Sequence, residues 1–590
     1  MAKSRTDDMN STYHAPLEDS IFLLSKVLNW NTLFAFPGFK HVDEELAKAI
    51  LTEGAKFTSE ILAPLNEVGD REGSRLVDGK VITPEGFKEA YNKFKEAGWS
   101  GLDMPEEYGG QDLPISVQVA FAEMINGACI SFGMLPIMQR AAATLLLEHG
   151  DAEIVGRVVS KLVSGDWGAT ICITEAQAGS DVGRIKTTAS LQEDGSYRLS
   201  GSKIFISYGD QDLTAQITHL VLARMPDAPA GTRGISLFLV PKINFDSDSQ
   251  NNVSVSRLEK KMGLKASPTC VLDLDDAVGY RIGEENRGLH CMFTMVNLMR
   301  LEVSIQGPAI AAAACNKAIA YANERLQGGA ADKKAIAIIE HADVRRMLFI
   351  MRARTEAMRA LVFEAAFNLD IVKASPDKKQ ADSARQLAEF LLPVCKAAGS
   401  QTGFEVANLA IQVLGGHGYI SDHGVEQYAR DVRVSMIYEG SNGIQALDLV
   451  TRKLLKDEGQ RYTLFINRVE QDIAGFEGLE HIQLILTALR QGLQYLSAST
   501  DYFLNCVPEA RRDVEAGATD YLNLLALVAS SWMWLRISAH VDESTEFGRS
   551  KIAVGNFHAE HIMPECQLLS TRVMLGANTI DSISGDILGT

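Results

Sequence analysis

One carboxylate in this chain has surroundings that could give it a chemical role. Glu439 lies between the apolar, aromatic-tipped run 436–438 (MIY) and the pliable segment 440–443 (GSNG). Apolar surroundings disfavour the charged form of a carboxylate, so its pKa rises toward neutral pH and it can accept a weakly acidic proton. On this segment alone, a surface turn with one solvated glutamate is the more common explanation, so the rest of the chain must decide.

A strand-like segment followed by a loop of small residues, 171–189 (ICITEAQAGSDVGRIKTTA), could hold a ligand. The small residues from Ala176 to Ser180 would let a flat or phosphorylated molecule approach backbone N–H groups, while Thr174 and Asp181 supply polar atoms. The segment has neither the GK[ST] of a P-loop nor a GxGxxG motif. Taken alone, it is more often a connecting turn than a ligand cradle.

Two further segments carry side chains of interest. In 199–210 (LSGSKIFISYGD), strand alternation places Phe205 and Ser207 on one face, where they could stack on and hydrogen-bond a planar ring, or pack in the core. In 412–420 (QVLGGHGYI), Gly415 has the position of a helix stop. His417 and His423 have no carboxylate or thiol at ligand spacing, so no metal site is predicted.

The composition describes a globular protein and excludes some classes of function. There are 57 basic and 75 acidic residues, a net charge of −18, which argues against broad binding of nucleic acid or anionic membranes. The eight cysteines are scattered without a CxxC pair, which predicts buried free thiols in a reducing compartment.

The first twenty residues lack a signal-peptide core, and the apolar stretch 521–535 is shorter than a membrane span. We expect a bacterial cytoplasmic protein; an organelle matrix is the alternative.

The order of elements predicts a mainly α protein with a central β domain. Residues 1–40 form an irregular lead-in, 41–164 have helical periodicity, and 165–285 contain short β-branched runs between turns. Helical periodicity returns over 286–455, as in a helix bundle, and a further helical block covers 456–590.

Five motifs together resemble the acyl-CoA dehydrogenase family over most of residues 40–455. They are TEAQAGSDV, GSKIFIS, YANERLQGG, QVLGGHGY and RDVRVSMIYEGSNGIQ, in the family's order and spacing. The resemblance implies an N-terminal helical domain, a middle β-barrel-like domain, a C-terminal four-helix bundle and, here, an extra C-terminal helical region. A finer resemblance, carried by HLVLARMPDAPAGTRGISLFLVPK, KKMGLKASPTC and the long C-terminal block, is to the long 3-methylthiopropionyl-CoA dehydrogenase subgroup.

The resemblance implies FAD as cofactor and assigns a role to each matching residue. Glu439 is the catalytic base that removes the α-proton of an acyl-CoA thioester, as the β-hydride passes to the flavin and a trans-2-enoyl-CoA forms. Thr174 hydrogen-bonds the flavin, and Phe205 and Ser207 lie against its isoalloxazine ring. Other implied cofactor contacts are Arg325, which reaches the FAD pyrophosphate of a neighbouring subunit, and Gln412, Leu414, Gly415, Gly416, Ser441 and Asn442. The implied substrate contacts are Ser180, at the CoA moiety, with Arg300 and Gly440.

Some positions depart from the family's commoner pattern. Branches that place the base elsewhere have it just before the arginine of the first bundle helix, where this chain has Met299 before Arg300; methionine cannot accept the proton. Asn297 stands where many members have aspartate, and His341-Ala342 where many have His-Gln, which removes one expected amide contact to FAD.

The resemblance also implies partners and leaves alternatives open. The expected electron acceptor is an electron-transferring flavoprotein, and the shared cofactor site implies a homodimer, with the extra C-terminal block in the place of tetramer contacts. The substrate is either 3-methylthiopropionyl-CoA or a medium- or long-chain fatty acyl-CoA. An acyl-CoA oxidase and a non-dehydrogenase flavoprotein that binds DNA are the other readings; the net charge and the intact Glu439 argue against the second.

Overall fold

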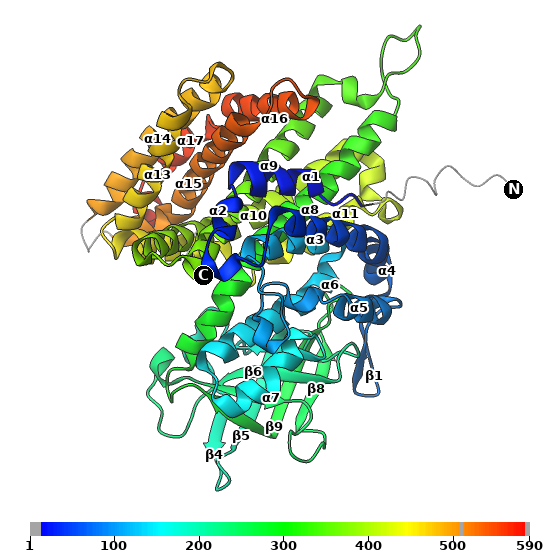
Figure 1. The fold of residues 1–590 in the computed structure, drawn as a ribbon, viewed down its shortest axis with the longest axis vertical. Coiled ribbons are helices and arrows are strands. Elements are labelled where there is room, and N and C mark those ends of the chain that lie inside the picture. Colours follow the sequence, from blue (N-terminus) through cyan, green and yellow to red (C-terminus); the bar gives the residue numbers. More distant parts are fainter. Residues whose placement is uncertain (1–12, 507–510, 584–590) are drawn as a thin grey trace, which may run out of the picture. The chain divides into compact units, whose positions relative to one another are not determined.

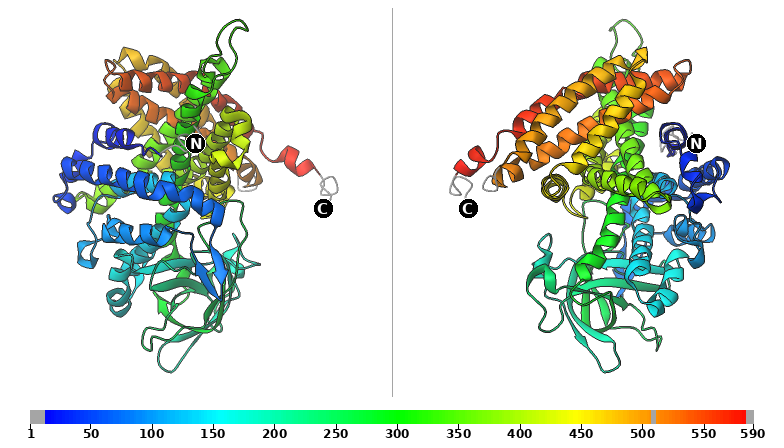
Figure 2. Two further views of the ribbon diagram at one scale, coloured as in Figure 1. Left: turned by 90° about the vertical axis from the view of Figure 1, so that its right-hand side faces the viewer. Right: turned by 60° about the vertical axis from the view of Figure 1, so that its left-hand side comes forward.

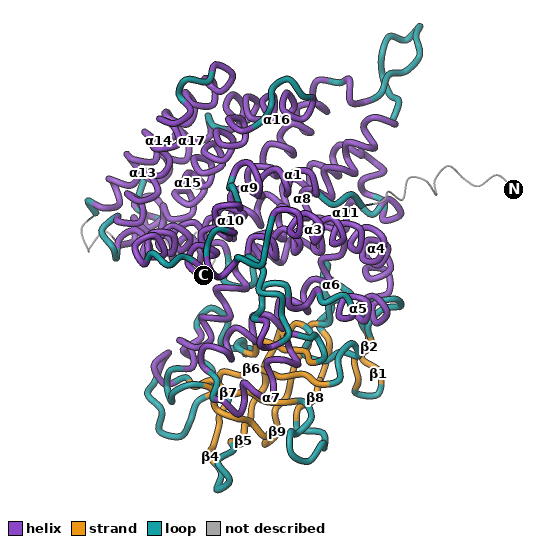
Figure 3. Tube along the Cα trace, viewed as in Figure 1, coloured by secondary structure: helices purple, strands orange, loops and turns teal. Residues whose placement is uncertain are grey.

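The computed structural model describes residues 13–506 and 511–583, which form two compact units. The bundle unit comprises residues 1–55, 115–123 and 303–590, and the sheet unit comprises 56–114 and 124–302. The expected lead-in and C-terminal block are therefore described only in part, because residues 1–12, 507–510 and 584–590 lie outside the described residues. The mainly helical architecture with one substantial sheet is shown in Figures 1 and 3.

The sheet unit is built on a seven-stranded sheet with the order β3-β6-β7-β9-β5-β4, in which β8 also pairs with β9. Among the described strands, β3 and β6 pair in parallel, and the other strand pairs of this sheet are antiparallel. The strands are β3 (Trp167–Cys172), β4 (Thr188–Leu191), β5 (Tyr197–Ser207), β6 (Gln216–Ala223), β7 (Ser236–Pro241), β8 (Val253–Leu258) and β9 (Thr269–Ile282). Strand β6 is buried along its whole length, which explains its continuous rather than alternating apolar sequence. Figure 3 shows the strands gathered in one body with α7 beside them.

Helices complete the sheet unit. They are α4 (Ala63–Glu72), α5 (Phe87–Glu96), α7 (Ala152–Val163) and parts of α6 (Ile115–His149) and α8 (Gly288–Glu324). Helix α7 begins after Asp151, whose carboxylate accepts a hydrogen bond from the backbone N–H of Ile154 at 2.9 Å and so caps the helix. Helix α6 is broken at Cys129, which has φ −158° and ψ 90°.

The sequence predicted a helical domain over 41–164, with a Gly/Pro loop at 99–114, and this was incomplete because it contained no strands. A β-hairpin pairs β1 (Arg75–Val77) with β2 (Lys80–Ile82). Its turn residues Asp78 and Gly79 have φ of 49° and 74°, as the two-residue turn that suits the twist of paired strands requires. The Asp-Gly dipeptide between short apolar runs was the available signal, but three residues a strand are too few for alternation to show.

The bundle unit centres on three long helices, α8, α9 (Ala342–Ala374) and α10 (Lys378–Leu414), joined by the shorter α11 (Val425–Val432) and α12 (Asn442–Leu447). Small residues let these helices pack closely. A Cβ added at Gly307 of α8 would overlap the carbonyl oxygen of Gly399 of α10, so the two backbones touch at this crossing. This contact fixes α8 against α10. Both helices also supply side chains that hydrogen-bond the segment around Glu439.

The lead-in 1–40, expected to be irregular, is helical where it is described. It contains α1 (Leu17–Phe22), a π-helical turn (Leu23–Val27) and α2 (Asn31–Phe34), before α3 (Glu44–Phe57). Leu23, Leu24, Val27 and Leu28 are buried, a helical spacing that the aromatic residues of the segment obscured.

The C-terminal region forms a further helical layer, as predicted. Its helices are α13 (Gln460–Phe476), α14 (Gln483–Leu504), α15 (Arg511–His540), α16 (Glu546–Phe557), α17 (Glu565–Val573) and α18 (Asn578–Ser582). Figures 1 and 2 show α13, α14, α15 and α17 side by side. Helix α15, which is buried along most of its length, carries Trp532 and Trp534, both fully buried. The indole N–H of Trp534 donates to the carbonyl of Ala353 on α9 at 3.1 Å, so this layer is fastened to the bundle.

Among the described helices, two, α6 and α15, are long and apolar enough to cross a membrane by length and composition. The most apolar windows of these helices are 94% and 89% buried inside the protein. Core helices satisfy the same criteria, so the observation is weak evidence for a membrane span.

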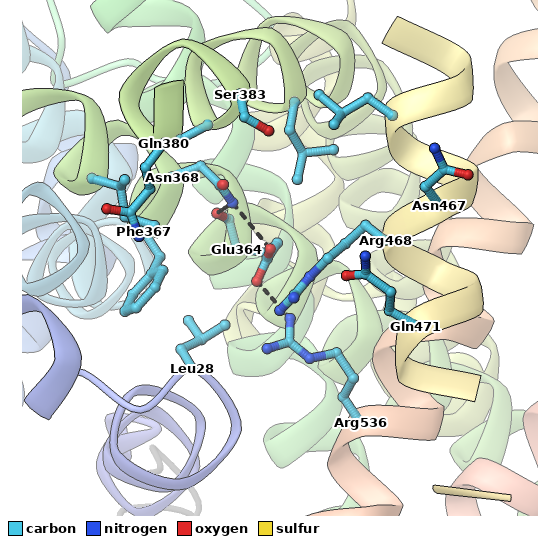
Figure 4. Close-up of a pocket in the computed structure, with 14 residues that line it drawn as sticks. Leu28, Glu364, Phe367, Asn368, Gln380, Ser383, Asn467, Arg468, Gln471 and Arg536 are labelled. Carbon is cyan, nitrogen blue, oxygen red and sulfur yellow. Dashed lines mark hydrogen bonds and ion pairs between the residues drawn. The ribbon is translucent and has the colours of Figure 1, made fainter. Parts of the chain in front are cut away.

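A buried ion pair joins the C-terminal layer to the bundle beside a cavity of about 330 Å³. Figure 4 shows Arg536 of α15 reaching Glu364 of α9, while Arg468 and Gln471 reach toward the pair from α13. The guanidinium of Arg536 donates to the Glu364 carboxylate at 2.6 Å, and Asn368 donates to the same carboxylate at 3.0 Å. Burial raises the pKa of Glu364, but the arginines and these hydrogen bonds outweigh it and hold that pKa below its usual value.

We expect Arg536→Met to destabilise the protein, because Glu364 would keep a buried charge without its partner. The expected loss is about 3 to 5 kcal/mol, measured as a fall in the urea midpoint of unfolding. Arg490→Met removes an exposed pair with Glu477 and is the matched control, with an expected loss below about 1 kcal/mol. Equal effects of the two substitutions would contradict this account of the ion pair.

Candidate active site

In the sheet unit, the chain brings Thr174 and Phe205 together at the edge of β5. The carbonyl of Thr174 accepts a hydrogen bond from the N–H of Ile204 at 2.9 Å. The pairing of β5 with β9 shifts register between Lys203 and Ile206, which inserts one extra residue, and Phe205 there has φ +61°. A bulge of this kind re-aims a side chain. The Phe205 ring is accordingly 60% exposed, while Ile206 beside it is buried and Ser207 is half-buried.

A buried ion pair fixes the loop that carries Thr174. The ammonium of Lys203 donates to the carbonyl of Ile173 at 3.1 Å and to the carboxylate of Glu175 at 2.8 Å, so it holds the residues on both sides of Thr174. Burial raises the pKa of Glu175, but the charge and hydrogen bond of Lys203 outweigh it and bring that pKa to about 2. The loop is therefore held rigidly against β5.

The other predicted residues of the sheet unit lie on different elements. Ser180 is exposed on the small-residue loop after β3, and Arg300 is half-buried on α8 next to the buried Met299. Three methionines of this part of α8, Met292, Met295 and Met299, are buried.

In the bundle unit, Glu439 is half-buried and has a left-handed backbone conformation. Its φ is +53°, and Gly440 follows with φ +87°. A non-glycine residue in this region carries strain of about 1 kcal/mol or more and is frequently found at functional sites. The strain turns the chain sharply between the short helical turn Arg433–Met436 and the start of α12.

Side chains of three helices hold this segment. The hydroxyl of Tyr438 donates a hydrogen bond to the side-chain oxygen of Gln306 on α8. The ammonium of Lys396 on α10 donates to the carbonyl of Gly440 at 2.7 Å. The amide of Gln445 on α12 donates to the carbonyl of Glu439 at 3.0 Å. Burial and, after it, the charge of Glu439 raise the pKa of Tyr438, so its hydroxyl stays neutral and remains a donor.

The remaining predicted cofactor residues of the bundle unit lie at the ends of α8 and α10. Arg325 is exposed just after α8, and Gln412, Gly415 and Gly416 are exposed at the end of α10. The hydroxyl of Tyr321 and Nδ1 of His417 are 2.7 Å apart, which ties these two helix ends together. Leu414 is buried in the helix core, so its side chain does not face solvent. Ser441 and Asn442 follow Gly440 at the start of α12, and the side chain of Asn442 donates to the carbonyl of Ala397 at 3.2 Å.

Two cavities of the bundle unit contain no predicted site residue among their described lining residues. The cavity beside Arg536 and a larger one of about 770 Å³ near Leu455 and Val514 are lined by other parts of the chain. Among residues 13–506 and 511–583, no group of three or more His, Cys, Asp or Glu side chains gathers in a way that could hold a metal ion.

Comparison with known proteins decides the family. Residues 45–166, 170–277 and 286–455 match the family models described as the N-terminal, middle and C-terminal domains of acyl-CoA dehydrogenase. The chain belongs to the acyl-CoA dehydrogenase family. Residues 465–583 of this acyl-CoA dehydrogenase match a further model, described as acetyl-CoA dehydrogenase C-terminal like. The fold class predicted from the sequence is confirmed, and the protein is an oxidoreductase that acts on acyl-CoA.

Individual relatives resemble almost the whole chain. The 3-methylmercaptopropionyl-CoA dehydrogenase of Ruegeria pomeroyi is 39% identical over 95% of this chain and 98% of its own length. The broad-specificity linear acyl-CoA dehydrogenase FadE5 of Mycobacterium tuberculosis is 31% identical over 98% of this chain and 99% of its own. An acyl-CoA dehydrogenase of Bacillus anthracis, solved in complex with FAD, has the same fold, with a TM-score of 0.75 and 20% identity over 93% of this chain and 90% of that one.

FAD is the cofactor of the family, and two features of this structure suit it. The exposed, bulge-presented ring of Phe205 offers a flat apolar face for a planar ring system. At Gly415 and Gly416, a Cβ would meet no heavy atom within 4 Å, so the backbone there is open to a ligand or a partner chain.

Sequence reasoning missed the residues that hold the site. Lys203, Lys396 and Gln445 are fully buried, and each hydrogen-bonds the backbone of a segment that carries a predicted site residue. The available signal was a lysine or glutamine inside an otherwise apolar stretch, as in 394–398 (VCKAA), because a buried polar side chain needs a partner.

We expect Glu439→Gly to be more stable than Glu439→Ala, because glycine adopts a left-handed φ without steric cost. The expected difference is about 1 kcal/mol in unfolding free energy, from urea unfolding of the two variants. The same comparison at Glu458, an exposed glutamate with φ +55°, is the matched control, and we expect the same preference for glycine there. An alanine variant as stable as the glycine variant at position 439 would show that Glu439 is not strained.

Proposed function

We propose that this acyl-CoA dehydrogenase converts 3-methylmercaptopropionyl-CoA, or a closely related short thioether acyl-CoA, to its trans-2-enoyl thioester, with Glu439 as the base. The substrate assignment is supported by the relative of that name, which shares 39% identity with this chain, compared with 31% for the enzyme of linear acyl-CoA. The buried methionines of α8 are consistent with a polarisable wall near a thioether, although methionine is also an ordinary core residue.

The conformation of Glu439 is the observation that carries the catalytic assignment. Glu439 is half-buried and its backbone is strained, while the carbonyls of Glu439 and Gly440 accept hydrogen bonds from two buried side chains, so the residue is held for a purpose other than solvation. In the proposed reaction its carboxylate takes the α-proton. The backbone N–H of Glu439 donates to the thioester carbonyl and so stabilises the negative charge that develops there. The chemistry that FAD supplies when bound is acceptance of the β-hydride.

The cofactor and substrate contacts follow the same assignment. We assign Thr174, Phe205 and Ser207 to the flavin, and Gln412, the backbone of Leu414, Gly415, Gly416, Ser441 and Asn442 to the rest of FAD. Ser180, Arg300 and Gly440 are assigned to acyl-CoA. The exposed positions of Phe205, Ser180, Gln412 and the two glycines leave them accessible to these ligands.

We propose that the enzyme is a homodimer that passes electrons to an electron-transferring flavoprotein. Beside Arg325 and Gly416, the side chains of Leu326, Tyr419 and Ile420 are exposed, and Tyr419 is 85% exposed. Exposed apolar groups next to residues assigned to a neighbouring subunit's cofactor fit a subunit interface. Sedimentation of the holoenzyme at the mass of a single 64.3 kDa chain would contradict the dimer.

A linear medium- or long-chain acyl-CoA is the second candidate substrate, because the FadE5 relative covers as much of this chain. The distinction depends on a few methylenes of pocket depth, each of which contributes only about 1 to 3 kcal/mol of discrimination.

The test is an anaerobic titration of the purified holoenzyme with 3-methylmercaptopropionyl-CoA and with C4 to C16 acyl-CoA thioesters, followed by bleaching of the flavin band. We expect the thioether substrate and its isosteric short-chain analogue to bleach the flavin at the lowest concentrations. Preferential bleaching by C12 to C16 thioesters would assign a long-chain substrate. No bleaching by any thioester would reject the proposed reaction.

We expect Glu439→Gln to abolish the reaction while leaving the ligands bound. Glutamine keeps the size and the backbone but cannot accept the α-proton, so the rate of bleaching should fall by orders of magnitude at unchanged FAD content. The control is Glu458→Gln, which changes the other left-handed glutamate of this unit, and should keep the wild-type rate. Near-normal bleaching by the Glu439 variant would remove Glu439 from the mechanism.

A further inference from the structure

The segment that carries Glu439 is held by two fully buried side chains that reach it from different helices. Lys396 of α10 donates to the carbonyl of Gly440 at 2.7 Å and to the side-chain oxygen of Asn442 at 3.3 Å. Gln445 of α12 donates to the carbonyl of Glu439 at 3.0 Å and, at 3.4 Å, to that of Gly440. The two peptide planes that follow Glu439 are therefore bound by a buried cation and a buried amide.

Of the two polar atoms of the Gln445 amide, the nitrogen makes hydrogen bonds and the oxygen makes none with the described residues. Its Nε2 reaches two carbonyls, whereas its Oε1 is buried and has no hydrogen-bond partner among the described residues. Rotating the amide would bring its oxygen against carbonyl oxygens, so the orientation is settled by its surroundings. A buried acceptor without a partner costs about 1 to 3 kcal/mol, and an apolar residue of similar volume would avoid that cost. The presence of a glutamine here in spite of this cost is explained if its donors are needed at Glu439.

Asn442 connects this arrangement to α10 a second time. Its side-chain oxygen accepts from Ser400 at 3.2 Å as well as from Lys396, and its amide donates to the carbonyl of Ala397. Helix α10 is itself fixed against α8 at the Gly307–Gly399 crossing. The left-handed turn at Glu439 and Gly440 is thus attached to a rigid part of the bundle.

We propose that Lys396 and Gln445 are positioning residues, which together hold the left-handed peptide at Glu439 and Gly440 so that the base and its backbone N–H have a fixed place relative to the substrate. This inference rests on the proposed role of Glu439 as the base. Neither side chain takes part in proton transfer. Lys396 and Gln445 act by removing conformations of the segment in which the carboxylate points away from the α-carbon, since a displacement of about 1 Å can reduce a rate about 100-fold.

The test measures the first reduction of the flavin by acyl-CoA in the holoenzymes of Lys396→Met, Lys396→Gln, Lys396→Arg and Gln445→Leu. At saturating acyl-CoA we expect the Met and Leu variants to bleach about 10- to 100-fold more slowly, while the half-saturating concentration changes less than about threefold. The Arg variant keeps a charged donor and should recover part of the rate. The Gln variant keeps a donor without the charge and should fall between Arg and Met.

The matched control is Lys551→Met, which removes another buried lysine of the bundle unit. Lys551 donates to Asp19 at 2.6 Å and to Glu356 at 2.7 Å, far along the chain from the Glu439 segment. We expect it to lower the thermal midpoint of unfolding without slowing bleaching at saturation. A comparable slowing in this control would overturn the proposal, because it would show a general effect of losing a buried lysine.

The outcomes separate this inference from the function on which it rests. If Lys396→Met does not fold, Gln445→Leu tests the same segment from the other side. Wild-type rates in either folded variant, with FAD bound, would overturn the positioning role while the proposed function stands. A wild-type enzyme that no thioester bleaches would instead reject the function.

Discussion

The bundle unit depends on charges that are buried and must satisfy one another. Arg359 of α9 donates to Glu123 at 2.7 Å and to Asp19 of the lead-in at 2.9 Å, and Lys551 of α16 bridges Asp19 to Glu356 of α9. Burial raises the pKa of Glu123 in spite of Arg359, whereas the charges of Lys551 and Arg359 outweigh burial and lower the pKa of Asp19. Four segments that are remote in sequence therefore meet at one network, and any other arrangement of them would leave a charge unpaired in the interior.

This constraint explains why the ends of the chain belong to the core. The lead-in and the C-terminal helices contact α9 through ion pairs rather than through apolar surface alone, and Arg536 with Glu364 repeats the pattern further along α9. An apolar contact tolerates a shift of register, but a buried charge does not. The helices of the extension are thereby fixed relative to the bundle helices that carry the Glu439 segment.

The sequence predicted the parts of this molecule in which local pattern and tertiary environment agree. The long helices α8, α9 and α15 fall in the blocks 286–455 and 456–590, where helical periodicity was expected, and the strands β5 and β9 fall in the predicted β block 165–285. The prediction of an irregular lead-in over 1–40 was wrong because the aromatic residues of this segment obscured the helical spacing of its buried leucines. The eight cysteines are free, and seven are buried, as expected.

The residues of the candidate site could also be predicted only in part from the sequence. Residues in loops with unusual composition, such as Glu439 among glycines, could be found from the sequence, and so could the Phe205 strand. What the sequence could not show was the conformation: no pattern indicates that Phe205 lies in a bulge or that Glu439 has a positive φ. The buried lysines that hold both segments were also missed, since a lysine in a helix or strand is normally read as a solvent-facing residue.

The strained conformation at Glu439 needs support from elsewhere in the bundle. A left-handed glutamate and an amide oxygen without a partner both favour relaxation of the segment, by about 1 kcal/mol or more each. The hydrogen bonds of Lys396, Gln445 and Asn442 oppose that relaxation only if α10 itself cannot move. The Gly307–Gly399 crossing provides this condition, because two backbones in contact leave no space for adjustment. A side chain at either glycine would separate α8 from α10 and withdraw Gln306 and Lys396 from the segment together. The fixed place of the proposed base Glu439 thus originates in two glycines that have no chemistry of their own.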